Sequence, residues 1–276
     1  MPLKSTPSQS TAADIERLLA IMAKLRDPDS GCPWDKAQSF ATIVPFTLEE
    51  AYEVADTIER LALEELPGEL GDLLFQVIFY CQLGKEQGLF DFSVVVDKIC
   101  TKLTERHPHV FGEHGGNGEL SAAWVKDSWE AIKAKERQAN EQHSVLDNIP
   151  LSLPALARSV KIQQRVARVG FDWAELEPVV AKIHEEIDEV LHEVRQSRVD
   201  AAKVRDEMGD LLFAVTNLAR HLGVEPEQAL RQANAKFERR FRGVETLATA
   251  DGKALTDHDL EALDAFWDQV KHQEKR

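Results

Sequence analysis

Two short motifs place acidic side chains within otherwise apolar stretches of the chain. Glu69 and Asp72 stand in E-L-G-D-L-L-F, and Glu207 and Asp210 stand in E-M-G-D-L-L-F. Because residues three positions apart share one face of a helix, each motif predicts a narrow acidic stripe on a helix that is otherwise apolar and buried on most sides. Burying unpaired carboxylates is costly, and like charges raise each other's pKa. A positive charge must therefore compensate these acids.

A second acidic motif, E-E-x-x-E, precedes each stripe. In the C-terminal copy, Glu186 and Glu189 can face Glu207 and Asp210 if the two helices are antiparallel neighbours. No Lys or Arg follows Glu207 at the third or fourth position, so a divalent cation is the expected compensator. Oxygen ligands without Cys or His suit Mg²⁺, or Mn²⁺ in its place, better than zinc. The N-terminal half offers a second set of candidate ligands, namely Glu50, Glu53, Glu69 and Asp72.

Basic and aromatic side chains follow the C-terminal acids. Lys236 and Arg240 are four residues apart and share a helix face, as do Trp267 and Lys271 near the C-terminus. Mg²⁺ keeps coordination positions open for substrate phosphates, and Arg and Lys are natural phosphate-binding groups. We therefore interpret Lys236 and Arg240 as a phosphate clamp, and Trp267 as either a core aromatic or a surface on which a base stacks.

The elements that must position these residues are helices. Apolar residues recur at spacings of three and four along nearly the whole chain, and no run alternates as a strand would. Four patterns occur twice in the same order, at nearly constant separation, which indicates a duplicated unit. Besides the two acidic motifs, the first copy contains Lys102 with Arg106, and Trp129 with Lys133 and Glu136.

These observations predict an all-α protein with two tandem helical bundles. We divide the chain into a polar N-terminal tail (1–13), a first helical domain (14–135), a polar and proline-bounded linker (136–154) and a second helical domain (155–276).

Composition restricts the partners. A net charge of −15 argues against nucleic acid or an anionic membrane as the main partner, although an anionic small substrate remains compatible if cations bring it in. The polar start does not resemble a signal peptide, and the most apolar run is shorter than a membrane helix requires. Three cysteines without a C-x-x-C pair suit reduced thiols in the cytoplasm.

The chain resembles the MazG-type nucleoside triphosphate pyrophosphohydrolases along nearly its whole length. The acidic motifs are shared with a wider all-α superfamily of nucleotide pyrophosphatases. The tandem arrangement and the flanking stretches are similar to MazG in particular: G-C-P-W-D-K-A-Q (31–38), R-H-P-H-V-F-G (106–112), R-V-G-F-D-W (168–173) and K-F-E-R-R-F (236–241).

The resemblance implies hydrolysis of ribo- and deoxyribonucleoside triphosphates between the α and β phosphates, with Mg²⁺ or Mn²⁺. It implies a homodimer that pairs through helix packing, a role in nucleotide-pool housecleaning or stress response, and activity in the C-terminal half. It also implies that nucleotide is lined by Lys182, Lys203, Lys236, Arg239, Arg240, Trp267 and Lys271. We add Glu185, adjacent to the metal ligands, as the candidate general base.

Three other interpretations remain open at this stage. A ferritin-like di-iron site needs two E-x-x-H motifs, and the sequence has one, at Glu189 and His192. A zinc site could be formed by His107, His109 and His114, although that segment lacks cysteine. An acidic helical adaptor could bind metal only to hold its fold, which a pyrophosphate-release assay would distinguish from an enzyme.

Overall fold

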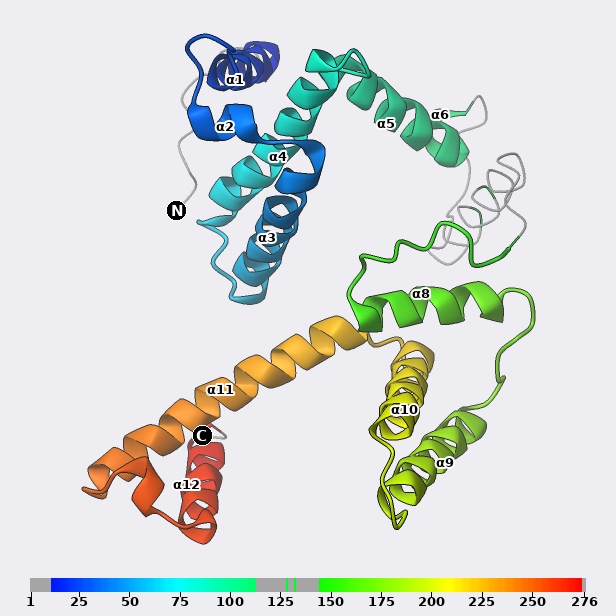
Figure 1. Ribbon diagram of the computed structural model, residues 1–276, viewed down its shortest axis with the longest axis vertical. Coiled ribbons are helices and arrows are strands. Elements are labelled where there is room, and N and C mark those ends of the chain that lie inside the picture. The colour runs from blue at the N-terminus through cyan, green and yellow to red at the C-terminus, as the bar shows by residue number, and fades with distance from the viewer. Residues whose placement is uncertain (1–10, 113–127, 129–131, 133–143, 275–276) are drawn as a thin grey trace. The chain divides into compact units, whose positions relative to one another are not determined.

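The computed structural model describes residues 11–112, 128, 132 and 144–274, and the chain divides into two compact units (Figure 1). The N-terminal unit spans Met1–Ala134 and the C-terminal unit spans Lys135–Arg276. The described residues form helices and contain no strand, so the predicted all-α class is confirmed. Several residues singled out above lie outside the described part: 1–10, His114, Trp129, Lys133, Glu136 and the linker residues 136–143.

The N-terminal unit is organised around the antiparallel pair α3 (Phe40–Glu59) and α4 (Leu66–Glu86), against which α1 (Thr11–Leu25) packs. Side chains at the helix starts satisfy free backbone N–H groups: Ser39 and Thr42 form a capping box, and Asp91 accepts from Val94 N at 3.0 Å. The helices are α1 (Thr11–Leu25), α2 (Pro33–Ala37), α3 (Phe40–Glu59), α4 (Leu66–Glu86), α5 (Phe92–Arg106) and α6 (Pro108–Phe111).

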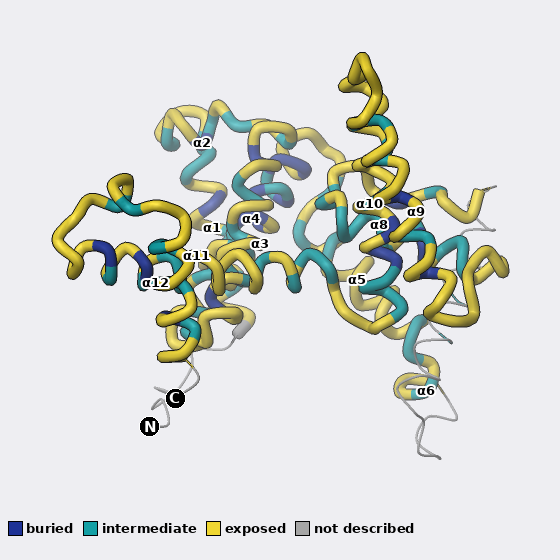
Figure 2. The backbone as a smooth tube through the Cα atoms, turned by 90° about the horizontal axis from the view of Figure 1, so that it is seen from below, coloured by how far each residue is buried: buried dark blue, intermediate teal, exposed yellow. Residues whose placement is uncertain are grey.

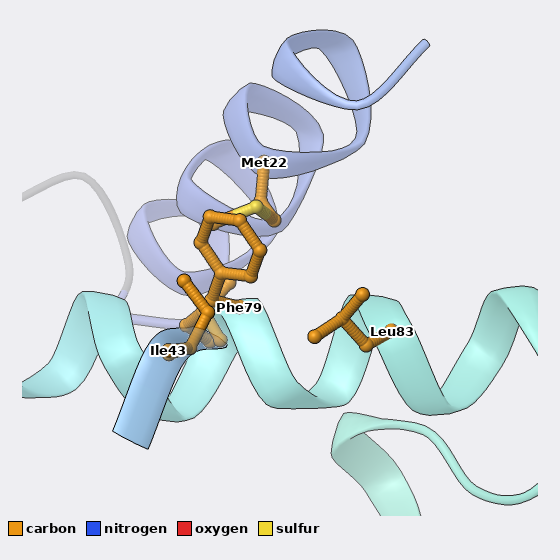
Figure 3. Packing of buried hydrophobic residues seen from close by; sticks show 5 residues of the cluster. Met22, Ile43, Phe79 and Leu83 are labelled. Atoms are coloured by element: carbon orange, nitrogen blue, oxygen red, sulfur yellow. The ribbon is translucent and has the colours of Figure 1, made fainter. Parts of the chain in front are cut away.

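The core of this unit lies where α1 crosses α3 and α4. Figure 3 shows the ring of Phe79, from α4, directed toward Met22 of α1, with Ile43 of α3 beside it. All three side chains are at most 1% exposed. Burying a large apolar side chain contributes about 1.5–3 kcal/mol, so this contact fixes α1 on the helix pair.

The C-terminal unit repeats the arrangement and adds a long arm. α9 (Leu176–Val194) and α10 (Ala201–His221) form the antiparallel pair, and α8 (Ala155–Ala167) packs on α10. α12 (Leu260–Gln273) packs along α11 (Pro226–Ala250) (Figure 1). Asp200 caps α10 through Ala202 N, and Asp259 caps α12 through Ala262 N, each at 2.9 Å. The elements are α8 (Ala155–Ala167), α9 (Leu176–Val194), α10 (Ala201–His221), α11 (Pro226–Ala250), the 3₁₀ turn η1 (Leu255–Asp257) and α12 (Leu260–Gln273).

The acid-bearing helices are less buried than their composition predicts. Figure 2 shows long exposed stretches on α9 and α10. On α10, Met208, Leu212 and Val215 are 41%, 52% and 45% exposed, because α8 and α9 cover only part of the helix. One chain therefore leaves an apolar face of this helix pair in solvent.

The segment before α8 is tied to the C-terminal unit. Residues 144–154 contain turns and no helix, and Val145 O accepts a hydrogen bond from Arg165 Nη1 of α8 at 3.1 Å. Ile149 is buried. None of the described helices carries an apolar stretch of the length that a bilayer crossing requires.

Candidate active site

Three acidic side chains converge between α9 and α10. Glu186 of α9 and Glu207 and Asp210 of α10 offer carboxylate oxygens that all lie within 4.8 Å of one another. Glu186 is only 4% exposed, and its Oε2 atom is buried without a hydrogen-bond partner. We call these three residues the C-terminal cluster. An orphaned buried carboxylate oxygen beside two further acids is a site that a cation would stabilise.

Glu189 lies at the edge of the C-terminal cluster. Glu189 is exposed, but partial desolvation of its carboxyl raises its pKa, and the charges of Glu186 and Glu207 raise it further. The charge of Lys182 acts in the opposite direction. Glu189 therefore interacts electrostatically with Glu186 and Glu207, and its place among the metal ligands stays a prediction.

A lysine within the chain partly compensates the cluster, which the sequence reasoning did not foresee. Lys182 Nζ lies 2.8 Å from Glu185 Oε1 and 2.6 Å from Glu186 Oε1. The hydrogen bonds that Lys182 donates to Glu185 and Glu186 hold its pKa well above the ordinary value. The sequence signal for this contact is a lysine one turn before Glu186, whereas the positions one turn after Glu207 carry no basic residue.

The N-terminal unit contains a matching set of acids. Oxygens of Glu50, Glu69 and Asp72 also lie within 4.8 Å of one another, and we call these residues the N-terminal cluster. Burial and the neighbouring Glu53 raise the pKa of Glu50. Gln76 Nε2 approaches Glu50 Oε1 at 3.4 Å. Phe46 stands one turn before Glu50, so this cluster has no counterpart of Lys182 at that position.

A cavity with a volume of about 650 Å³ opens beside the C-terminal cluster. Lys182, Glu186 and Asp210 line one end. The other end is lined mainly by apolar side chains from α8, from the loop after it and from α10, together with a few amides and one ion pair: Ile162, Gln163, Val166, Gly170, Phe171, Asp172, Trp173, Phe213, Ala214, Asn217 and Arg220.

The predicted basic groups of α11 and α12 form a cluster of their own. Glu274 accepts from Arg239 Nε at 3.0 Å and from Arg240 Nε at 2.8 Å, and these bonds lower its pKa. The guanidinium of Arg240 lies 5.9 Å from the ring centre of Trp267. Lys271 Nζ bonds to Asp268 at 2.9 Å. Within one chain, none of these predicted basic and aromatic side chains lines the cavity beside the C-terminal cluster.

The two remaining lysines and the candidate base are solvent-exposed. Lys236 is exposed on α11, and Lys203 Nζ lies 3.8 Å from Glu193 Oε1 with its side chain 62% exposed. Glu185 is 57% exposed and contacts Lys182 rather than the C-terminal cluster.

Comparison with known proteins matches both acidic clusters to one domain family. The sequence profile of the MazG nucleotide pyrophosphohydrolase domain matches residues 38–111 and again residues 175–244, more than half of the chain. The chain belongs to the MazG nucleotide pyrophosphohydrolase family. The family predicted from the sequence motifs, and the enzyme class that goes with it, are thereby confirmed.

Two relatives of this MazG protein match the chain over almost their whole length. The chain is 57% identical over 260 residues to the nucleoside triphosphate pyrophosphohydrolase of Escherichia coli K12, covering 94% of this chain and 98% of the relative. It is 40% identical over 256 residues to the nucleoside triphosphate pyrophosphohydrolase/pyrophosphatase MazG of Thermotoga maritima, covering 93% and 95%.

The cavity residues of the second MazG domain were missed by the sequence reasoning. Phe171 and Trp173 belong to the R-V-G-F-D-W stretch (168–173) that resembles the family, but the sequence analysis assigns them no role in a site. Gln163 and Asn217 are buried amides on helices α8 and α10, and a polar residue on the inner face of such a helix was the available signal.

The ferritin-like di-iron site receives no support from the geometry of the MazG domains, and the alternative zinc site includes His114, which lies outside the described residues. Among the described residues, the groups of acidic, histidine and cysteine side chains close enough to hold an ion are the two acidic clusters, and neither contains histidine. His192 instead contacts the side chain of Gln196, and the rings of His107 and His109 lie 5.6 Å apart.

Proposed function

We propose that this protein hydrolyses ribo- and deoxyribonucleoside triphosphates between the α and β phosphates, in a metal-dependent reaction of the C-terminal MazG domain. The products are a nucleoside monophosphate and pyrophosphate, and the role is housecleaning of the nucleotide pool or a stress response. The observation that carries the proposal is the C-terminal cluster, which opens onto a cavity large enough for a nucleotide. The names of the two relatives support the same activity.

The residues of the C-terminal cluster fit Mg²⁺, with Mn²⁺ as a substitute. They offer only carboxylate oxygens, one of which is buried and unpaired, and hard divalent cations prefer such ligands. Glu186, Glu189, Glu207 and Asp210 would hold the ion. When bound, it would neutralise phosphate charge and favour ionisation of the attacking water.

Lys182 and Glu185, at the edge of the site, are assigned phosphate binding and proton acceptance, respectively. Lys182 lines the cavity and its Nζ contacts both Glu185 and Glu186, so it is placed to exchange one carboxylate for a phosphate oxygen of the substrate. That exchange frees the Glu185 carboxylate to accept a proton from the attacking water. Binding of the triphosphate and activation of the base are thereby coupled.

We further propose that the active form is a homodimer. One chain leaves an apolar face of α9 and α10 exposed, and places Arg240 and Trp267 on a separate arm. A second copy that packs on the exposed face would bury it, and could bring cationic side chains of its own α11 and α12 toward the triphosphate tail. Lys203, Lys236, Arg239, Arg240, Trp267 and Lys271 are the residues expected to act there.

Product analysis tests the proposed reaction. ATP or dATP incubated with the protein and Mg²⁺ should give the monophosphate and pyrophosphate in equal amounts, and removal of divalent ions with EDTA should abolish the reaction. Release of inorganic phosphate with formation of ADP would contradict cleavage between the α and β phosphates.

A further inference from the structure

Glu274, at the C-terminal end of α12, has no part in the reaction proposed above. It ends the repeated pattern that begins with Trp267 and includes Lys271. One oxygen of its carboxylate accepts a hydrogen bond from Arg239 Nε at 3.0 Å, and the other accepts from Arg240 Nε at 2.8 Å. A single acidic side chain of α12 therefore joins two neighbouring arginines of α11.

The packing of α12 along α11 brings Glu274 to these arginines (Figure 1). Val270, one turn before Glu274, lies so close to Gly243 of α11 that a Cβ atom at that glycine would stand 2.8 Å from a methyl carbon of Val270. Val270 and Val244 are both buried there. Because a close-packed contact of this kind leaves little freedom to slide, it fixes the register of the two helices and the place of Glu274.

The position of Glu274 is unfavourable for its own helix. It is the C-terminal cap residue of α12, and the free carbonyl groups at that end of a helix carry a partial negative charge that repels a carboxylate. The hydrogen bond from Arg240, together with that from Arg239, lowers the pKa of Glu274 and keeps it ionised. An acid that works against its helix but is held by two cations points to a role in the arginine contact.

The contact with Glu274 leaves most of each guanidinium group for a ligand. A guanidinium carries five N–H groups, and Glu274 takes the one on Nε from each arginine. The guanidinium carbon of Arg240 also lies 5.9 Å from the ring centre of Trp267, so its plane is held on two sides. Two adjacent guanidinium groups repel each other, and the shared carboxylate offsets that repulsion.

We propose that Glu274 is a positioning residue that holds Arg239 and Arg240 together as one pair for the triphosphate tail. A guanidinium of fixed orientation can give a phosphate two parallel N–H···O bonds. Two such groups held side by side suit neighbouring phosphates of one chain, so the pair selects for the tail of the nucleotide. Glu274 itself touches no substrate. This inference rests on the proposed function, because it takes the ligand to be a nucleoside triphosphate.

Replacement of Glu274 by Gln tests the positioning role. Glutamine keeps the size of the side chain but has no charge and only one oxygen, so it cannot accept from both arginines. Glu238→Gln is the matched control, because it removes a contact with Arg242 at 3.4 Å on the same helix and involves neither Arg239 nor Arg240. For each protein, KM and kcat are measured with ATP and Mg²⁺, and tripolyphosphate and AMP are measured as competitive inhibitors.

We expect Glu274→Gln to raise KM for ATP and the inhibition constant of tripolyphosphate about tenfold each, while kcat and the inhibition constant of AMP change less than about twofold. AMP has no β and γ phosphates for the arginine pair to hold, whereas a general loosening of α12 would weaken AMP as well. Glu238→Gln should leave all four values unchanged. An unchanged KM for ATP, or an equal loss of affinity for AMP, would overturn the positioning role.

A combined variant tests whether Glu274 acts through the arginines. In a protein that already carries Arg239→Met and Arg240→Met, the addition of Glu274→Gln should change KM for ATP less than about twofold. A further tenfold rise in that background would show that Glu274 acts by another route, and would overturn the proposal.

Binding measurements separate this inference from the proposed function. If the unsubstituted protein releases no pyrophosphate from ATP, the proposed function fails, and calorimetric titration with tripolyphosphate and Mg²⁺ decides the positioning role. A Kd about tenfold higher in Glu274→Gln than in the unsubstituted protein would support it, and equal Kd values would overturn it.

Discussion

Lys182 Nζ lies 2.6 Å from Glu186 Oε1, one turn before it on α9, so a cation of the chain itself lies at the edge of the C-terminal cluster. Glu186 is nearly completely buried, whereas the Lys182 side chain is 34% exposed. This lysine therefore stabilises the acids when metal is absent, and it repels a metal ion that enters the cluster.

Replacement of Lys182 by Met should separate these two effects. Without metal, the free energy of unfolding should fall by about 1–2 kcal/mol, because Glu186 loses its partner and solvent screens part of the interaction. With Mg²⁺, the gain in melting temperature should exceed that of the unsubstituted protein, because a competing positive charge is gone. Thermal unfolding in EDTA and in Mg²⁺ measures both effects.

The control for this variant is Lys203→Met, which removes a lysine that is 62% exposed and 3.8 Å from Glu193. It should change stability in EDTA by less than about 0.5 kcal/mol. Equal stability of the Lys182 and Lys203 variants in EDTA would show that the contact with Glu186 carries no net stabilisation.

The pair formed by Arg26 and Glu86 predicts a pH dependence in the N-terminal unit. Arg26 donates to Glu86 at 2.7 Å, and this bond lowers the pKa of Glu86 below its ordinary value of 4.5. The stabilisation is therefore present above that value and is lost as the pH falls through the folded pKa. Glu86→Gln should cost about 1–2 kcal/mol at pH 7, and the difference should shrink as the pH falls below that ordinary value.

Urea unfolding of the two proteins at a series of pH values measures this difference. Glu65→Gln serves as the control, because its partner Arg60 has a side chain that is 49% exposed. That substitution should cost less than about 0.5 kcal/mol at any pH. A Glu86 variant whose deficit is the same at pH 7 and at pH 3 would refute the assigned role of Arg26.

The exposed apolar face of α10 predicts the oligomeric state. Leu212→Arg places a charge on a residue that is 52% exposed in one chain, and it should dissociate the proposed homodimer and abolish most of the hydrolysis. Leu151→Arg, at a loop residue that is 85% exposed, should leave both properties unchanged. Analytical ultracentrifugation measures the mass, and a monomeric unsubstituted protein with full activity would refute the dimer proposal.

The spacing of the acids predicted much of the fold and of the candidate site. Glu207 and Asp210 had to share a helix face, and the preceding motif had to face them if the helices paired, because these follow from helical periodicity alone. The cavity could not be predicted in the same way. It depends on how far α8 stands from α10 and on the contact between Asp172 and Arg220, residues 48 positions apart.

The position of the basic residues within one chain could not be predicted from the sequence either. Lys236 and Arg240 were expected beside the acids, but the chain turns sharply between α10 and α11, at Gly223 with a φ of +68°. That turn carries α11 away from the C-terminal cluster, and α12 follows it. The direction of a helix after a turn is set by packing, which the pattern of residue types does not encode.

The most direct test of the account compares Glu207→Gln with Glu69→Gln, the equivalent substitutions in the two clusters. Pyrophosphate release from ATP is measured with Mg²⁺, and circular dichroism confirms that helix content is retained. We expect Glu207→Gln to lower the rate at least about 100-fold, because the C-terminal cluster holds the metal, and Glu69→Gln to leave it within about twofold. Persistent turnover in Glu207→Gln, with helix content intact, would contradict the assignment of the C-terminal cluster as the catalytic centre.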